Sequence, residues 1–409
     1  MTIHRTIQIG QLCFSLHFLD TKNHNFFKIA MKTKVQKIKI GITGRNGFIG
    51  SFLTNTLTYL NEQFKIIDFE RDYFSKQDKM LTFVKECNVI VHLAGINRND
   101  DEKFIYQTNI SLTEKIIKAC ELTNSKPHII FSSSTQENKI NAYGKSKKIS
   151  HQLFSIWSEK NNASYTGLII PNVFGPFCKP NYNSVVATFC NQLTKEKKPE
   201  VLNDSQLFLI YVGELVEIII NKIQNKKRIN ESIDVNFTKK IKVSELLKKL
   251  TSFKNNYFEK GVIPDINSTF DKNLFNTFLC YIDHEKFYPF NLIQHKDNRG
   301  SFVETIKLNS GGQISFSTTK SGITRGNHFH TRKAERFTVI KGKARIDLRK
   351  IGSNKILTFD LDGESPSFVD MPVWHTHNIT NIGKNELLTI FWINEPYDPN
   401  DSDTFFEKV

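Results

Sequence analysis

The stretch Lys37–Leu60, KIKIGITGRNGFIGSFLTNTLTYL, decides the fold class of the N-terminal part. Residues 38–43 are mostly apolar, glycines follow at positions 44, 47 and 50, and apolar residues then recur with helical spacing. This pattern predicts a buried strand, a tight turn and an amphipathic helix. Glycines allow the turn and let backbone N–H groups approach a pyrophosphate at the positive end of the helix. A glycine triplet also occurs in ordinary strand–helix turns, but a second apolar strand at Phe64–Phe69 favours dinucleotide binding.

Length and composition restrict the class of protein. The chain has 409 residues, a formal net charge of +15 and six cysteines without C-x-x-C spacing. The length predicts two domains, and the cysteine pattern favours a reducing cytoplasm. The positive charge is most simply a solvated lysine-rich surface, and otherwise attracts anionic ligands such as nucleotide phosphates. Nothing resembles a basic, aromatic-interleaved stripe for nucleic acid, and no apolar run approaches the roughly 20 residues that insert across a membrane.

Strand and helix patterns alternate from Lys37 to about Asn236, as in a doubly wound parallel sheet. We expect this α/β domain to occupy residues 35–280, with strands at 88–93, 127–132 and 164–170 and helices at 108–122, 143–160, 243–253 and 271–278. Residues 1–34 fit no such pattern, and Met31 begins a segment that would start a protein of this kind naturally. We therefore expect residues 1–34 to be a disordered extension or an upstream misread.

Polar side chains follow the strand at 127–132. Ser134 ends a serine triplet there, and Tyr143 and Lys147 share one face of the next helix because they are four residues apart. A neighbouring ammonium would lower the pKa of the phenol from about 10 and favour proton donation to a carbonyl under reduction. Ser134 can hold the same carbonyl oxygen. A Tyr/Lys pair alone is common on exposed helices, but its combination with the glycine turn predicts chemistry.

The motifs TGRNGFIG, HLAG, the serine triplet and YGKSK resemble the extended short-chain dehydrogenase/reductase family, a Rossmann-type fold. Extended members mostly act on nucleotide-linked sugars. The resemblance implies a catalytic set of Ser134, Tyr143, Lys147 and Asn109. The expected cofactor site consists of Gly44, Arg45, Asn46, Gly47, Phe48, Ile49, Arg71, Leu93, Ala94, Gly95, Tyr143, Lys147 and Pro171.

The choice of cofactor depends on three charged residues. Asp68 ends the second strand and could bind a ribose 2′-hydroxyl, which favours NAD. Arg45 in the glycine turn and Arg71 after the strand could bind a 2′-phosphate, which favours NADP. Because two cations outweigh one carboxylate, we expect NADPH.

From His284 onward, short β-rich runs replace the helical pattern and predict an all-β barrel or sandwich over residues 281–409. His328 and His330 alternate on a strand, Glu335 follows on the return strand, and His377 lies in PVWHTHNITN. Two histidines on a strand without further ligands would usually be exposed surface residues. Three imidazoles and one carboxylate at this spacing predict a site for Zn²⁺ or another first-row divalent metal.

These two histidine motifs resemble the cupin family, in which glycine usually occupies the position of Trp374. We expect the indole to narrow the mouth of the pocket. The sequence leaves the role of the metal open, and it leaves Lys333, Arg325, His375 and Tyr397 as alternative bases.

An extended reductase followed by a metal cupin resembles the bifunctional CapF-type (WbjC-type) enzymes of bacterial capsule and O-antigen synthesis. The resemblance implies a UDP-linked 4-keto-6-deoxy amino sugar as substrate, epimerised at C3 by the cupin and reduced at C4 with NADPH. The implied product is UDP-2-acetamido-2,6-dideoxy-L-talose, on the route to UDP-N-acetyl-L-fucosamine. We also expect a homodimer or higher homo-oligomer.

Two other functions are compatible with the domain order. One is a single-activity nucleotide-sugar dehydratase or epimerase with a structural β-domain, and the other is a non-enzymatic sensor of NADP and sugar. Dehydratases commonly carry acidic residues beside the serine, whereas Thr135 and Gln136 follow Ser134 here. Sensors typically lose the Tyr-x3-Lys pair, which this chain keeps. Both observations favour a reductase.

Overall fold

The structure of the chain is a computed structural model. It describes residues 36–225, 227, 229–292, 294–297, 300–303, 306–308, 312–395 and 400–409. The expected extension, residues 1–34, lies outside these ranges. Residues 38–409 belong to one unit. Within the described ranges, no helix combines the length and the apolar character needed to span a bilayer.

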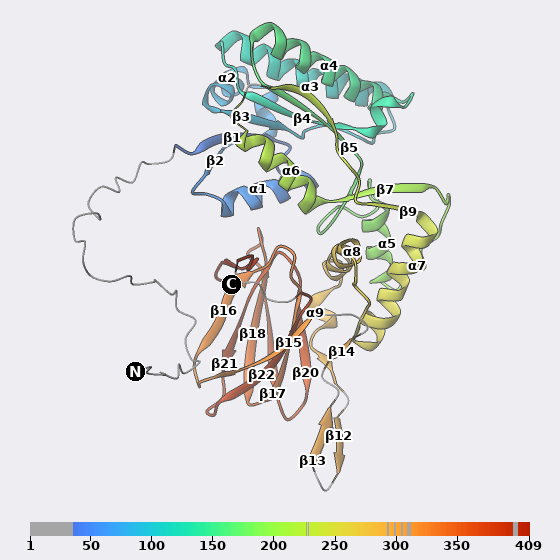
Figure 1. Cartoon of the computed structure of the whole chain (residues 1–409), viewed down its shortest axis with the longest axis vertical. Coiled ribbons are helices and arrows are strands. Elements are labelled where there is room, and N and C mark those ends of the chain that lie inside the picture. Colours follow the sequence, from blue (N-terminus) through green and yellow to red (C-terminus); the bar gives the residue numbers. More distant parts are fainter. Residues whose placement is uncertain are drawn as a thin grey trace, which may run out of the picture. The chain divides into compact units, whose positions relative to one another are not determined.

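Six parallel strands form the N-terminal sheet in the order β2-β1-β3-β4-β5-β8. Their bounds are β1 Ile38–Thr43, β2 Phe64–Ile67, β3 Val89–His92, β4 His128–Ser134, β5 Tyr165–Ile170 and β8 Asn230–Asp234. Helices α2 (Gln77–Glu86), α3 (Glu102–Thr123) and α4 (Ala142–Asn161) cover one face, and α1 (Phe48–Tyr59) and α6 (Val212–Gln224) cover the other (Figure 1). Strand β3 is buried along its whole length because both faces are covered. The predicted doubly wound sheet is confirmed.

The strand order reverses between β1 and β3, which places a crevice at the carboxyl ends of these two strands. Beyond β5 the chain forms a small sheet of β6 (Asn172–Phe174), β7 (Gln206–Tyr211) and β9 (Lys239–Lys242). The same part of the chain contains the helices α5 (Val185–Leu193), α7 (Val243–Phe253) and α8 (Thr269–Leu279). Short elements complete this part, namely η1 (Arg71–Phe74), η2 (Thr135–Asn138), η3 (Lys254–Phe258), β10 (Val262–Ile263) and α9 (His284–Phe287).

The C-terminal part consists mainly of two antiparallel five-stranded sheets, as the predicted all-β domain requires. One has the order β11-β20-β17-β22-β15, with β11 Phe290–Asn291, β15 Gln313–Thr319, β17 Glu335–Lys341, β20 Ser367–Met371 and β22 Leu387–Ile393. The other has the order β19-β18-β21-β16-β23, with β16 Thr324–Phe329, β18 Lys343–Lys350, β19 Ile356–Asp362, β21 His375–Asn381 and β23 Phe405–Phe406. Two small pairings add β12 (Gln294–Asp297) to β13 (Gly300–Val303) and β14 (Lys307–Leu308) to β10.

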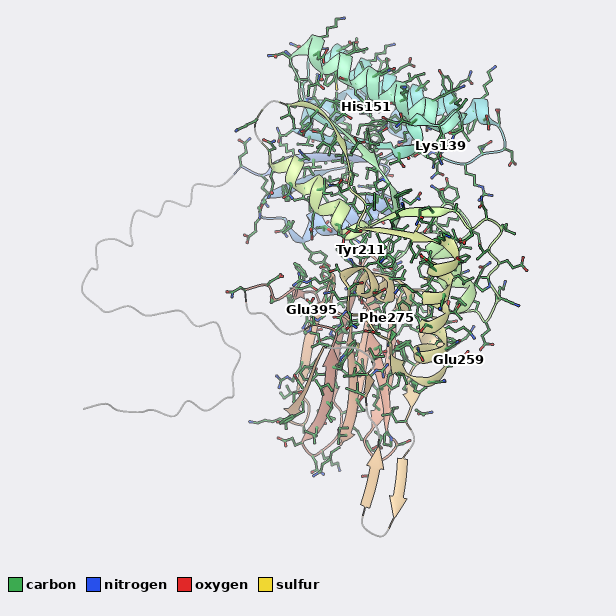
Figure 2. All side chains as sticks on the ribbon, turned by 45° about the vertical axis from the view of Figure 1, so that its right-hand side comes forward. Lys139, His151, Tyr211, Glu259, Phe275 and Glu395 are labelled. Atoms are coloured by element: carbon green, nitrogen blue, oxygen red, sulfur yellow. The ribbon has the colours of Figure 1, made fainter. Side chains whose placement is uncertain are left out.

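A single hydrophobic cluster connects the α/β part with the β domain. Figure 2 places Tyr211 and Phe275, two members of this cluster, in the region where the two parts meet. The indole of Trp374 lies edge-on against the ring of Phe52 in α1, with 4.6 Å between ring centroids. The predicted boundary between residues 280 and 281 stays a prediction, because this cluster extends across it.

The side chain of Trp374 packs on the α/β part. It is buried against Phe52 in α1 and against Phe329, and the expected narrowing of a pocket mouth stays a prediction. Its φ angle is 59°, in the left-handed region where glycine is favoured. Glycine, the residue usual at this position of the resembled motif, adopts such a conformation with less strain than tryptophan.

Candidate active site and metal centre

The glycine turn after β1 sits in the crevice between β1 and β3. Gly44 has φ +77°, and a Cβ there would lie 2.8 Å from the backbone nitrogen of Ala94. A Cβ on Gly50 would lie 2.1 Å from the carbonyl oxygen of Gly44. Gly47 is the N-cap of α1, so the first N–H groups of this helix are available to an anion in the crevice.

A cleft of about 490 Å³ begins at this turn. Its wall includes the predicted catalytic residues Ser134, Tyr143 and Lys147. Other predicted cofactor residues that line it are Gly44, Asn46, Gly47, Phe48, Ile49, Leu93, Gly95 and Pro171. Arg45, Arg71 and Ala94 are not part of this lining.

Burial controls the acidity of the two central groups. The ammonium of Lys147 donates to the backbone carbonyl of Ser132 at 2.6 Å and lies 5.8 Å from the centre of the Tyr143 ring. Burial lowers the pKa of Lys147 to about 8. Burial, followed by the charge of Tyr182, raises the pKa of Tyr143 to about 12, although a hydrogen bond with Ser134 lowers it. The expected lowering of the Tyr143 pKa is therefore wrong, and this phenol keeps its proton at neutral pH.

Asn109 supports the cleft from behind. Its amide nitrogen donates to the carbonyl oxygen of Ile96 and to Ser146 Oγ, both at 2.9 Å, and its amide oxygen accepts from the N–H of Ile96 at 2.7 Å. A Cβ on Gly95 would lie 3.2 Å from this oxygen. Asn109 thus fixes the segment after β3 against α4 without lining the cleft.

The charged groups near β2 form a network of their own. Arg45 donates to Asp68 at 3.1 Å and to Glu70 at 2.5 Å. Asp68 therefore points to Arg45 in this state, and its side chain is 88% exposed. Arg71 begins η1, beyond both carboxylates in the chain.

Several cleft residues were given no role by sequence reasoning, among them Asn97, Gln136, Phe177, Lys179, Tyr182 and Asn183. Phe177 has φ 66°, and the ammonium of Lys350 in the β domain lies 3.7 Å from its ring centre. Its sequence signal was its place directly after residues 171–176, PNVFGP, which resemble the segment that touches nicotinamide and substrate in extended reductases. Its position depends on the β domain, so no local pattern could identify it.

The predicted metal ligands come together in the β domain. One ligand atom from each of His328, His330, Glu335 and His377 lies within 4.8 Å of the others. Glu335 Oε2 lies 3.2 Å from His330 Nε2 and 3.0 Å from His377 Nε2. His328 and His377 are register partners on β16 and β21, which explains how motifs far apart in sequence meet.

The donor set fits a divalent cation. Among the described residues, His330 Nε2, His377 Nε2 and Glu335 Oε2 are buried without a hydrogen-bond partner. The other ring nitrogens are occupied, since His330 Nδ1 bonds to the carbonyl of Asp403 at 2.6 Å and His377 Nδ1 to that of His375 at 3.2 Å. These bonds direct the Nε2 lone pairs into the cluster, as in known metal sites. Burial, then the neighbouring His377 and His330, lowers the pKa of His328 to about 3, so this ring is neutral.

The candidate bases are engaged elsewhere. Lys333 donates to the carbonyl of Ser402 at 2.7 Å, and Arg325 donates to that of Thr318 at 3.1 Å. His375 bonds to the carbonyl of Val373 at 3.0 Å and packs against the ring of His284. Tyr397 lies outside the described residues. The geometry therefore selects none of the other three.

Comparisons with known proteins match both parts of the chain. Residues 40–237 match the NAD dependent epimerase/dehydratase family, and residues 295–405 match the polysaccharide biosynthesis C-terminal domain. A curated Pseudomonas aeruginosa protein, UDP-2-acetamido-2,6-beta-L-arabino-hexul-4-ose reductase, is 31% identical over 372 residues, covering 90% of this chain and 98% of that protein.

Solved structures give the same result. The capsular polysaccharide assembling protein CapF from Staphylococcus aureus is 33% identical, with a TM-score of 0.58 over 91% of this chain and all of that one. UDP-glucose 4-epimerase from Thermotoga maritima is 18% identical, with a TM-score of 0.52 over 60% of this chain and 98% of that one, and shows the fold alone. The chain therefore belongs to the CapF family of NAD(P)-dependent enzymes, in which an epimerase/dehydratase domain precedes a polysaccharide biosynthesis C-terminal domain.

Proposed function

We propose that this protein is a nucleotide-sugar reductase and epimerase of capsular polysaccharide biosynthesis. Its substrate is UDP-2-acetamido-2,6-dideoxy-L-arabino-hexos-4-ulose, and its product is UDP-2-acetamido-2,6-dideoxy-L-talose, on the route to UDP-N-acetyl-L-fucosamine. The observation that carries the proposal is the cleft that joins the glycine turn to Ser134, Tyr143 and Lys147. The activity named for the Pseudomonas relative supports the choice of sugar.

Reduction at C4 uses the α/β part of the chain. The bound nicotinamide supplies the hydride. Tyr143 donates its proton to the ketone oxygen, and it can do so because burial keeps the phenol protonated at neutral pH. Ser134 Oγ accepts from the N–H of Gln136 at 3.2 Å, and its own proton, hydrogen-bonded with Tyr143 here, can turn to the same ketone oxygen when the sugar binds. Lys147 spans from the carbonyl of Ser132 toward the space beside Gly95, where it can bind the cofactor ribose.

Epimerisation at C3 belongs in the β domain. A carbon next to a ketone loses its proton when the resulting enolate is stabilised. His328, His330, Glu335 and His377 would hold a zinc ion or another first-row divalent metal, which supplies Lewis acidity or structural rigidity when bound. The convergence of buried, unpartnered donor atoms supports this assignment.

We also propose NADPH as the cofactor. Asp68 and Glu70 already neutralise Arg45, which leaves Arg71 as the first cation after β2 in the sequence. A 2′-phosphate can displace the carboxylates from the guanidinium of Arg45, because phosphate forms strong bidentate bonds with arginine. Two arginines and a phosphate then complete the site.

The Tyr143→Phe variant tests the proposal, because it should lose reduction at C4 and keep proton exchange at C3. The variant keeps the packing of the ring and loses only the hydroxyl, so NADPH oxidation should fall by about 10²- to 10⁴-fold. Exchange of deuterium from heavy water into C3 of the 4-keto sugar should continue, because this step needs no hydride. Proton NMR of the sugar and absorbance of NADPH measure both signals.

Tyr106→Phe is the matched control, because it removes a phenol from α3 that is not part of the cleft lining. It should retain both signals. Loss of both signals together in Tyr143→Phe would show one shared active site and would contradict the division of labour proposed above.

A further inference from the structure

The last part of the chain, residues 403–407 with the sequence DTFFE, lies beside the predicted metal ligands. We call this segment the C-terminal tail. Its strand β23 pairs with β16, and the register places Phe406 opposite His328. No step of the proposed reaction uses the C-terminal tail. Its hydrogen bonds nevertheless converge on the segments that carry the three histidines.

Asp403 fixes the loop that follows His330. Its carboxylate accepts from the backbone N–H groups of Thr331, Arg332 and Lys333 at 3.1, 2.9 and 3.1 Å. It also accepts from the hydroxyl of Thr331 at 2.6 Å. Asp403 is 6% exposed, so these bonds form away from water, where hydrogen bonds to a carboxylate are strong. The carboxylate therefore holds three successive residues of this loop in one position.

The same residue orients the imidazole of His330. His330 Nδ1 donates to the backbone carbonyl of Asp403 at 2.6 Å, while His330 Nε2 lies 3.2 Å from Glu335 Oε2. Asp403 has a φ angle of 41°, a left-handed conformation that few residues other than glycine adopt, and the bonds of its carboxylate and carbonyl hold it there. A carbonyl that accepts from one ring nitrogen of a histidine sets the direction of the other. Asp403 thus directs His330 Nε2 into the ligand cluster.

The other end of the C-terminal tail contacts the two remaining histidine-bearing strands. The backbone N–H of Glu407 donates to the carbonyl of Asn327, which precedes His328, at 2.9 Å. The hydroxyl of Thr376, which precedes His377, donates to the carbonyl of Glu407. One short segment therefore binds a neighbour of each predicted histidine ligand.

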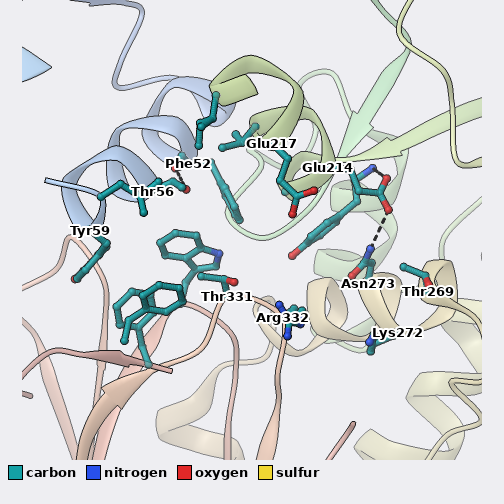
Figure 3. A pocket seen from close by; sticks show the side chains of 18 residues that line it. Phe52, Thr56, Tyr59, Glu214, Glu217, Thr269, Lys272, Asn273, Thr331 and Arg332 are labelled. Carbon is teal, nitrogen blue, oxygen red and sulfur yellow. Dashed lines mark hydrogen bonds between the residues drawn. The ribbon is translucent and has the colours of Figure 1, made fainter. Parts of the chain in front are cut away.

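The loop after His330 has limited packing on one side. Thr331 and Arg332 line a cavity of about 370 Å³ that also borders α1, α6 and α8 (Figure 3). Atoms that face a cavity lack neighbours there, so dispersion forces hold them less tightly. The hydrogen bonds with Asp403 therefore contribute much of what positions the loop and, with it, His330.

We propose that the C-terminal tail holds the ligands of the metal centre at their binding distances and that Asp403 is the positioning residue. This inference rests on the metal assignment proposed above. The predicted ligands come from separate strands, and a metal ion is bound tightly only when such ligands are held in place before it arrives. Without the Asp403 carboxylate, the loop can shift and His330 can turn away from the cluster.

The zinc affinity of the full-length protein, measured by competition with a zinc-binding dye, tests the proposal. Asp403→Ala should bind zinc about 10- to 100-fold more weakly than the unaltered protein, the order expected when an outer contact of a metal ligand is removed. Bound Co²⁺ gives a second readout, because its visible absorption depends on the number and arrangement of its ligands. The spectrum of the cobalt-loaded Asp403→Ala protein should differ from that of the unaltered protein.

Thr331→Val is a milder variant, because it removes the hydroxyl bond to Asp403 and keeps the backbone bond. It should weaken zinc binding by a smaller factor, and it keeps the proposal testable if Asp403→Ala does not fold. Asp401→Asn is the matched control, since its carboxylate is 67% exposed and binds the side chain of Arg332 at 2.7 Å. It should bind zinc within about twofold of the unaltered protein, because exposed ion pairs contribute little.

Zinc affinity that is equal in Asp403→Ala and the unaltered protein would overturn the proposal. This holds even if the thermal midpoint of the metal-free variant fell, because the C-terminal tail would then support only the fold. If Asp403→Ala does not fold, equal affinity in Thr331→Val would overturn the proposal in the same way. An unaltered protein that binds neither zinc nor cobalt would contradict the metal assignment itself, and this proposal with it.

Discussion

Removal of the Arg336 guanidinium should loosen the strand that carries Glu335, a predicted metal ligand. Arg336 and Asp370 are register partners on β17 and β20 and form two hydrogen bonds, of 2.8 and 3.0 Å. A third bond, of 2.8 Å, runs from the guanidinium to the carbonyl of Gly261 next to β10. The guanidinium also lies 3.7 Å from the ring centre of Phe368. Arg336 therefore holds the β domain to the chain that precedes it.

The expected magnitude follows from burial. Arg336 is 1% exposed and Asp370 is 3% exposed, so Arg336→Leu leaves a carboxylate without a partner in the interior. Such a change costs about 3–5 kcal/mol of unfolding free energy. Arg336→Leu with Asp370→Leu removes both charges and leaves only the carbonyl of Gly261 unpaired, at a cost of about 1–3 kcal/mol. The second substitution should therefore restore about 2 kcal/mol.

Hydrogen exchange of peptides that cover β17 and β20 measures this local stability in the full-length protein. Arg336→Leu should accelerate exchange at least a hundredfold, since each 1.4 kcal/mol is a factor of about ten. The double variant should recover more than tenfold of this loss. Exchange in the double variant as fast as in Arg336→Leu would refute the reasoning, because the unpaired charge would then not be the cause.

Three further predictions address the cofactor, the metal and pH. Arg71→Glu should raise KM for NADPH by about 10- to 100-fold and leave KM for NADH nearly unchanged. Lys76→Glu, which reverses an exposed charge in the same loop, is the control. Equal catalytic efficiency with both cofactors in the unaltered protein would contradict the preference for NADPH. His330→Ala should lose its metal in elemental analysis, and full occupancy in this variant would disprove the ligand assignment. Burial, then the charge of Lys147, lowers the pKa of His92 to about 3, so the unfolded chain binds a proton below pH 6.5 that the folded chain excludes. The free energy of unfolding should therefore decrease as the pH is lowered. Between pH 6.5 and 5, urea unfolding should show that His92→Gln loses about 2 kcal/mol less of this free energy than the unaltered protein. Parallel dependence of the two proteins on pH would contradict this.

Elements set by neighbouring residues could be predicted from the sequence. Helix α7 has the predicted bounds Val243–Phe253, because its apolar residues recur at helical spacing and the carboxylate of Glu245 accepts from the backbone N–H of Lys242 at its start. Helix α3 begins at Glu102, six residues before the predicted start, because Asp101 caps it by accepting from two backbone N–H groups. Asp101 is a residue type that commonly caps helices, but residues 102–107 lack the apolar spacing from which the helix at 108–122 was predicted.

Features that depend on distant contacts could not be predicted. Strand β21 reads HTHNITN and lacks an apolar pattern, yet it is almost entirely buried because it pairs with β16 and β18. The clustering of the four predicted metal ligands could be foreseen because each lies in a short motif with characteristic spacing, and their binding of a metal stays a prediction. The raised pKa of Tyr143 could not be predicted, because it results from burial and, next, from the charge of Tyr182, which depend on the folded surroundings of the phenol.

The contact between Phe52 and Trp374 restricts how this gene can change over time. The tryptophan occupies a left-handed backbone position that glycine would fill more easily, so its ring compensates by packing on α1. A smaller residue at position 52 removes that compensation, and a smaller residue at position 374 exposes α1. Substitutions at these two positions should therefore occur in pairs among descendants. The two parts of the chain should consequently be inherited together. Recombination that exchanges only one part should be tolerated only when the residues at positions 52 and 374 still fit each other.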